Sequence, residues 1–274
     1  MFIVIFVALP KMHGFSQIDT SRAQNDTIKE INLDSVIISA QVAPTVQSEL
    51  LRVVHIIRAE EIQQAPVTDL GSLLEFVRGI DIRQRGITGA QSDISMRGGT
   101  FDQVLLLLNG VNISDPQTGH HNMDIPVDVS VIERIEVLQG SGARIFGPNA
   151  FAGAINIITA SPDKAFPSVS LRGGLYGSAE MAVNLPFRTK KVYHILSLSG
   201  STTDGYTENT DYKKANAFYR MNAKIGKTKA NVQVGYVRKG FGANSFYSPK
   251  FPNQFEETST IFAAAGISDT NAQS

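Results

Sequence analysis

Alternation of apolar and polar residues constrains the fold of residues 161–274 more than any other feature of the chain. One run sets Tyr219, Met221, Ala223 and Ile225 against Arg220, Asn222 and Lys224, and the next sets Val232, Val234 and Tyr236 against Asn231, Gln233 and Gly235. A period of two predicts β-strands with one apolar face. Such faces contact lipid and lumen in a membrane barrel, but strands of a soluble sandwich alternate too. The period alone leaves both folds open.

The lengths of the connections favour the barrel, because membrane barrels have short periplasmic turns and long outer loops. Pro186–Lys191 and Gly226–Lys229 are short, whereas Ser199–Asn216 and Lys239–Glu257 are long and polar; the turn at Gly177 is a short exception. The strand candidates are Ser168–Leu175, Ala179–Leu185, Val192–Leu198, Ala217–Ile225, Ala230–Val237 and Thr260–Ile267. A plugged barrel uses about 22 strands, so the predicted barrel is incomplete.

Composition excludes several classes of function. The 25 basic and 25 acidic residues cancel, which gives no support for a nucleic-acid partner. The absence of cysteine removes disulfides, thiolate metal sites and cysteine nucleophiles. No nucleophile elbow, zinc motif or phosphate loop organises the remaining polar residues. We therefore expect neither an enzyme nor a bound cofactor.

The N-terminus predicts export. Phe2–Leu9 is apolar but much shorter than the roughly 20 residues of a spanning helix. It fits a signal-peptide core, with cleavage ahead of Gln17, and residues 1–16 are the predicted signal peptide. The first basic residue, Lys11, follows the apolar run instead of preceding it, so a loose hydrophobic terminus is the alternative.

Residues 17–49 form a predicted flexible leader, since they are polar and have few apolar groups to bury. Within it, Asp34–Ala40 is a short β-prone run that could add a strand to a partner's sheet. An ordinary edge strand is the alternative, and composition alone favours it.

Leu50–Ala160 alternates strand and helix signals, as a compact α+β domain does. Leu70, Leu73, Leu74 and Val77 lie on one helical face that Gly79 ends. The strand candidates are Arg52–Ile57, Ile80–Ile82, Ile94–Arg97, Val104–Leu108, Val131–Val137 and Ala154–Thr159, and Gly86–Asp93 is a predicted loop. These segments predict a mixed sheet with short helices.

From about Asp34 to Ala160 the chain resembles the TonB-dependent outer-membrane receptors. Asp34–Ala40 resembles the family's Ton box, and five further motifs follow in the family's order: Leu70–Ile82, Ile94–Gly98, Val104–Val111, Ile132–Val137 and the segment with Gly140, Arg144, Gly147, Ala150, Gly153 and Ile155–Ile157. The sequence departs from the family pattern at Asn109, where Asp is usual, and at Gln139 and Ser141. Asn keeps the turn chemistry of Asp before Gly.

The resemblance implies a fold and a function. The fold is an α+β plug domain, residues 50–160, followed in residues 161–274 by the first strands of a transmembrane antiparallel β-barrel. The function is binding of a scarce nutrient, such as siderophore-bound iron, cobalamin or another metal chelate, at the cell outer membrane. TonB then drives remodelling of the plug. Outer-membrane lipid is the other partner. A non-transporting binding or adhesion protein, or an inactive receptor fragment, is the alternative.

The resemblance also implies that Asp34, Ser35, Val36, Ile37, Ile38, Ser39 and Ala40 bind TonB as an unpaired strand. The predicted ligand-facing loops are Thr88–Asp93 and Ser114–Asn122, with Gln91, Ser92, Asp115, Gln117, His120, His121 and Asn122 as candidates. Adjacent histidines rarely present both rings to one ion, so polar contact is favoured over a metal site at His120 and His121. Asp204, Glu208 and Asp211 lack calcium-loop spacing, so a solvated loop is favoured there.

Five charges among apolar plug strands are candidates for contacts between plug and barrel: Arg97, Glu133, Arg134, Glu136 and Arg144. Buried charges are expected to be paired, and strands lining a polar lumen would offer partners; exposure to water at a sheet surface is the alternative. The aromatic residues between Lys239 and Phe255 are compatible with ligand contact or with a membrane-interface belt.

Overall fold

The structure is a computed structural model that describes residues 37–38, 45–46, 54–67, 69–86, 90–115, 118–140, 148–163 and 165–269. The predicted signal peptide and most of the leader lie outside these ranges. No helix within the described ranges is long and apolar enough to span a membrane. In the leader, β1 (Ile37–Ile38) pairs antiparallel with β2 (Thr45–Val46) in a two-stranded sheet.

The predicted plug domain is built on a five-stranded mixed sheet of order β3-β8-β9-β6-β7. Its strands are β3 (Val54–Arg58), β6 (Val104–Leu108), β7 (Val111–Asn112), β8 (Ile132–Gln139) and β9 (Gly153–Thr159). β6 and β9 are parallel, and the other pairs are antiparallel. All residues of β6 and β9 are buried, as their apolar runs predict.

Short helices and a hairpin complete the plug domain. The helices are α1 (Ala59–Gln64) and α2 (Leu70–Leu74), with 3-10 turns η2 (Phe101–Gln103), η3 (Gly119–His121), η4 (Val129–Val131) and η5 (Pro148–Ala150). Asp69 caps α2 by accepting from the Ser72 backbone N–H at 2.9 Å. The hairpin joins β4 (Ile80–Arg85) to β5 (Gln91–Met96). β5 begins three residues before the predicted strand, because polar residues that suggested a loop pair with β4 instead.

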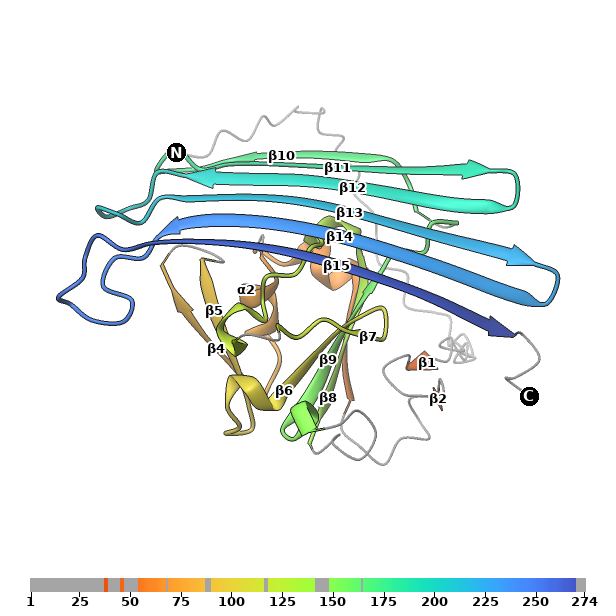
Figure 1. Cartoon of the computed structure of the whole chain (residues 1–274), viewed down its shortest axis with the longest axis horizontal. Coiled ribbons are helices and arrows are strands. Elements are labelled where there is room, and N and C mark those ends of the chain that lie inside the picture. The colour runs from red at the N-terminus through yellow and green to blue at the C-terminus, as the bar shows by residue number, and fades with distance from the viewer. Residues whose placement is uncertain are drawn as a thin grey trace, which may run out of the picture. The chain divides into compact units, whose positions relative to one another are not determined.

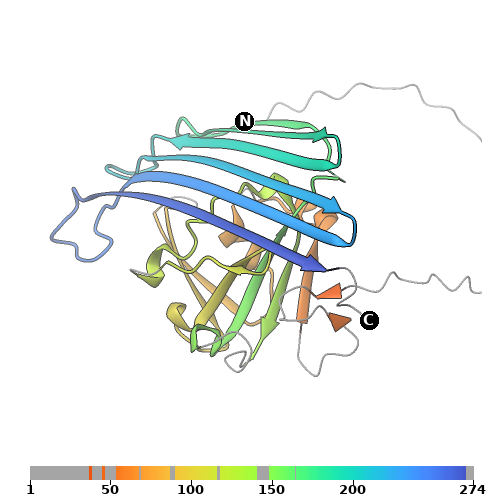
Figure 2. The same ribbon diagram turned by 45° about the vertical axis from the view of Figure 1, so that its right-hand side comes forward.

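The barrel strands are six consecutive antiparallel strands in the order of the sequence, drawn from green to blue in Figure 1. They are β10 (Ser168–Gly173), β11 (Ala179–Thr189), β12 (Val192–Thr203), β13 (Tyr212–Ile225), β14 (Thr228–Gly242) and β15 (Phe255–Asp269). The view in Figure 2 shows the same sheet open at both edges. The predicted fold class, an α+β plug with strands of an unclosed barrel, is confirmed.

Several barrel strands extend beyond their predicted ends, so the long connections shrink to residues 204–211 and 243–254. Sequence periodicity underestimates the lengths of these strands, because the inward-facing residues at their outer ends are polar. The plug domain supplies hydrogen-bond partners for such residues. The two faces differ as expected for a membrane barrel. Leu171 and Ile261 are 73% and 76% exposed on the outward face, whereas Gln233 and Lys239 are 3% and 2% exposed on the inward face.

The core of the plug domain continues into the barrel strands. Buried Leu106, Ile135 and Ile155 of the plug sheet belong to the same apolar cluster as Ile195 of β12 and Phe218 of β13. Burial of apolar surface contributes roughly 25 cal/mol per Å². The strands therefore stabilise the plug domain through apolar packing as well as polar contacts.

Gly153 lies where the plug sheet is most tightly packed. A Cβ on Gly153 would lie 2.3 Å from Met96 Sδ and 2.4 Å from the Leu138 carbonyl oxygen. The methionine can move, but the carbonyl belongs to the neighbouring strand β8. We expect Gly153→Ala to destabilise the plug domain by about 1–3 kcal/mol, the usual cost of overpacking.

The measurement is urea unfolding of the purified protein carrying one fluorophore on a cysteine introduced at exposed Glu75, which is selective because the chain has no cysteine. Gly200→Ala is the control, since the nearest contact of its Cβ would be the Lys214 carbonyl oxygen at an ordinary 3.6 Å. Equal unfolding midpoints for the two variants would contradict the prediction.

Candidate functional site

The predicted TonB-binding run lies only partly in the described residues. Ile37 and Ile38 form β1, which pairs with Val46 and Thr45; Asp34, Ser35, Val36, Ser39 and Ala40 lie outside the description. The expected unpaired strand is therefore paired along one edge. A partner's strand would have to use the other edge of β1 or displace β2.

Two plug segments meet the outer half of the barrel strands, residues 90–93 and residues 118–128. Lys239 of β14 donates from Nζ to the Ala90 carbonyl oxygen at 2.6 Å and to the Asp124 carboxylate. Thr258 of β15 donates to the same carboxylate at 2.8 Å. One buried lysine of the barrel strands thus contacts both plug segments.

The predicted ligand-facing residues form a network inside the plug. His120 Nδ1 lies 2.7 Å from Asp93 Oδ1, and its ring packs on Phe101 with centroids 4.3 Å apart. The Asn122 side-chain oxygen accepts from the Asp115 backbone N–H at 2.8 Å. These contacts shape the segment from within, and the side chain of His120 stays partly exposed.

The remaining ligand candidates are less accessible. Gln91 and Ser92 are buried at the start of β5, where the sequence predicted an open loop. His121 Nδ1 lies 3.7 Å from Asp124 Oδ2, and Gln117 lies outside the described residues. No group of three or more His, Cys, Asp or Glu residues in the described ranges could hold a metal ion.

The aromatic residues of the outer loop 243–254 and its borders separate into two sets. Phe246 packs on Phe241 with ring centroids 5.8 Å apart and joins a cluster with Ala90, and Arg85 lies 5.8 Å from the ring centroid of Tyr247. Phe255, on the outward face of β15, is 59% exposed. Phe246 and Tyr247 thus lie against the plug, whereas Phe255 faces outward, as an aromatic residue of a membrane-interface belt does.

Tyr247 can act as a neutral hydrogen-bonding group beside the plug. Partial burial raises the pKa of its phenol above the ordinary value, and the Glu256 carboxylate adds to this shift. The phenol therefore keeps its proton at physiological pH.

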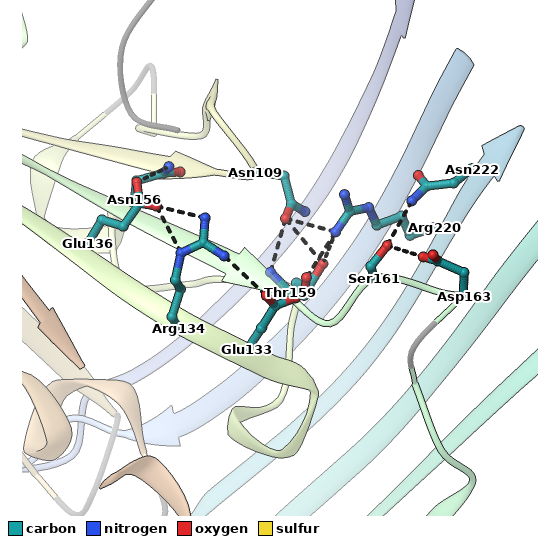
Figure 3. Close-up of polar contacts among 10 residues, drawn as sticks. All are labelled: Asn109, Glu133, Arg134, Glu136, Asn156, Thr159, Ser161, Asp163, Arg220 and Asn222. Carbon is teal, nitrogen blue, oxygen red and sulfur yellow. Dashed lines mark hydrogen bonds and ion pairs between the residues drawn. The ribbon is translucent and has the colours of Figure 1, made fainter. Parts of the chain in front are cut away.

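A second contact region lies deeper between the plug and barrel strands (Figure 3). Arg220 of β13 donates from Nη1 to Asn109 Oδ1 at 3.1 Å and to the carbonyl and hydroxyl oxygens of Thr159 at 3.0 and 2.9 Å. The Asn109 amide nitrogen donates to Gln233 Oε1 at 2.7 Å. An amide can both donate and accept here, which gives a physical reason for Asn where the family pattern has Asp.

The five predicted charged contacts show a different arrangement. Arg134 lies 2.9 Å from Glu136 and 3.1 Å from Glu133, and Glu136 also accepts from the Asn156 amide at 3.1 Å. These contacts, seen in Figure 3, lie within the plug. Arg97 is exposed at the end of β5, and Arg144 lies outside the description. Contacts of these charges with barrel strands stay a prediction.

A cavity of about 290 Å³ lies between the plug domain and strands β10–β13. Its charged lining residues are Asp69 and Asp128 from the plug and Arg172, Glu180 and Lys214 from the strands. Serine and threonine side chains line much of the remaining wall. A cavity of this size with polar groups in its wall can hold several waters, so plug and strands are separated here by a region able to hold water.

Comparison with known proteins agrees with this architecture. Residues 46–154 match the model of the TonB-dependent receptor plug domain. The vitamin B12 transporter BtuB of Vibrio vulnificus strain CMCP6 is 29% identical over 232 residues, which cover 83% of this chain and 34% of that protein. BtuB of Vibrio cholerae strain M66-2 is 31% identical over 126 residues, 46% of this chain and 20% of that protein.

Solved structures share the fold. The ferric yersiniabactin uptake receptor FyuA of Yersinia pestis is 18% identical with a TM-score of 0.57, covering 69% of this chain and 32% of that chain. The siderophore receptor PirA of Pseudomonas aeruginosa is 21% identical with a TM-score of 0.57, covering 79% and 37%. The chain thus spans between 20% and 37% of the length of these proteins. Residues 46–154 thus form a plug domain of the TonB-dependent receptor family, and the transporter relatives and the shared fold support an outer-membrane receptor of which this chain is a portion.

Proposed function

We propose that the protein binds cobalamin at the outer surface and admits it to the periplasm when TonB remodels the plug domain. The similarity to vitamin B12 transporters over 83% of this chain carries the choice of ligand. A ferric siderophore or another metal chelate is the second candidate, supported by the fold shared with siderophore receptors. The protein has no enzymatic role in this proposal.

The proposed ligand surface combines plug segments with outer loops. His120 belongs to the plug segment 118–128, while Phe246 of the loop 243–254 packs near Ala90 of the other segment and Tyr247 lies near Arg85 of β4. Loops carried on a rigid scaffold commonly form binding sites. Residues 50–160 would act as the gate, and residues 161–274 would form part of its channel wall.

TonB would bind the run Asp34–Ala40 by strand addition and pull on the plug. Main-chain hydrogen bonds supply affinity in this mode, and side chains of alternate residues supply specificity. Because β1 already pairs with β2 along one edge, the strand of TonB would pair with the other edge of β1 or replace β2.

Cells without their own outer-membrane cobalamin transporter provide the test. After production of the whole receptor that contains this chain, saturable binding and uptake of radiolabelled cyanocobalamin are expected, with uptake lost when a protonophore removes the energy source. A parallel panel of ferric siderophores tests the second candidate. Binding of neither class would contradict both ligand proposals, and binding with no energised uptake would favour a non-transporting binding protein.

A further inference from the structure

Lys239 lies in the outer half of β14. Its charged side chain faces inward and is buried against the plug domain. Its side chain is 3% exposed, and that of its partner Asp124 is 4% exposed. Burial of an ammonium or carboxylate costs several kcal/mol unless both are paired and hydrogen-bonded. The ammonium donates hydrogen bonds to two plug groups that help to meet this requirement, the Asp124 carboxylate and the Ala90 carbonyl oxygen.

The two acceptors belong to different plug segments. Ala90 directly precedes β5, and Asp124 follows η3, 34 positions later in the numbering. The same two segments are also joined inside the plug by the contact of 2.7 Å between Asp93 and His120. Lys239 therefore attaches an already connected pair of segments to the barrel strands.

β15 reinforces this attachment. Thr258 is the cross-strand partner of Lys239, and its hydroxyl donates to Asp124 Oδ2 at 2.8 Å. The ring of Phe241, two residues along β14, lies 5.2 Å from the ammonium. Two adjacent strands thus each present one donor to the same plug carboxylate. This geometry holds the carboxylate in position as well as balancing its negative charge.

We propose that Lys239, Asp124 and Thr258 form an apex latch that holds both ligand-facing plug segments against β14 and β15. Lys239 is a positioning residue, since it acts through the segments and is itself buried away from the outer surface. Opening of the latch frees the apex of the plug from the barrel strands. The effect on ligand affinity rests on the proposed function, whereas the mechanical attachment does not.

The latch predicts a pattern of amide hydrogen exchange in the protein purified from outer membranes in detergent. Lys239→Met should accelerate exchange in residues 90–93 and 118–128 by at least about tenfold, because both lose their hydrogen bond to the Lys239 ammonium. Exchange in β6 and β9 should not change. Arg238→Met is the matched control: Arg238 is one residue away on β14, faces outward, and pairs 2.5 Å from exposed Glu257.

A double variant separates attachment from the cost of an orphaned charge. In Lys239→Met/Asp124→Asn no buried charge is left unpaired, so a purely electrostatic penalty would disappear and exchange would return to the wild-type rate. The latch predicts that both segments stay fast in the double variant. Wild-type exchange in either segment of this variant, or equal acceleration in β6 and β9, would overturn the proposal.

Binding of cyanocobalamin to the same preparations gives an independent readout. The double variant should bind about tenfold more weakly, because the ligand must then order segments that the latch holds in the wild-type protein. Absence of cyanocobalamin binding by the wild-type protein would contradict the proposed ligand, and the exchange experiment would still decide the latch.

Discussion

Deletion of Asp34–Ala40 is expected to abolish uptake of labelled cyanocobalamin while leaving its binding to cells unchanged. The proposed ligand surface lies on the plug apex and outer loops, far along the chain from this run, so binding does not require it. Uptake requires mechanical work on the plug, and strand addition to this run is the proposed attachment for TonB. After surface-bound label is displaced, the label retained inside cells that carry the deletion variant should equal that of cells lacking the protein.

Deletion of Thr20–Asp26 is the matched control, because it removes the same number of residues from the same predicted leader. A flexible linker tolerates such a change, since its end-to-end distance varies only with the square root of its length. Uptake should therefore persist. If the variant without Asp34–Ala40 also transports, another segment must couple the plug to TonB, and the Ton-box prediction is wrong.

Glu136→Ala is expected to destabilise the plug domain by about 3–5 kcal/mol, the usual cost of breaking a buried ion pair from one side. The side chain of Glu136 has 0% exposure, and Arg134, 2.9 Å away, is 19% exposed. Removal of the carboxylate also takes the acceptor from the Asn156 amide. Urea unfolding followed by a fluorophore at Glu75→Cys would measure the loss.

Asp81→Ala is the control in the same domain. Asp81 pairs with Arg83 at 3.2 Å, but both side chains are largely exposed, at 64% and 77%. Exposed pairs contribute about 0–1 kcal/mol, so this variant should unfold near the wild-type midpoint. A similar small shift for Glu136→Ala would mean that Glu133, 3.1 Å from Arg134, compensates the arginine charge without Glu136.

Much of the plug fold could be predicted because its signals are local. The buried run Val104–Leu108 appears in the structure as β6, and Asn109-Gly110 forms the turn that leads into β7. Gly79 and Gly110 have positive φ values of 86° and 82°, which glycine adopts at low cost. Alternation likewise revealed six barrel strands, since lipid and lumen impose opposite preferences on neighbouring residues.

The candidate site was less predictable. Gln91 and Ser92 suggested an exposed loop by their polarity, yet pairing with β4 and packing against the outer barrel strands bury them. The sequence around Phe246 did not show that its ring packs toward the plug. That packing depends on the space left by the small residues Gly86 and Ala90. The sequence also did not predict the outer ends of the barrel strands, because the inward-facing residues there are polar and hydrogen-bond to groups of the plug.

The sequence by itself determined the order of the parts, the plug sheet and the two-sided character of the barrel strands, since periodicity, turns and buried runs act over a few residues. Only the tertiary structure decided which charges join plug to barrel. Arg220 and Asn109 lie 111 positions apart, and Lys239 and Ala90 lie 149 apart. Nothing local marks either partner, because a buried charge becomes favourable only when the fold brings its acceptors within hydrogen-bonding distance.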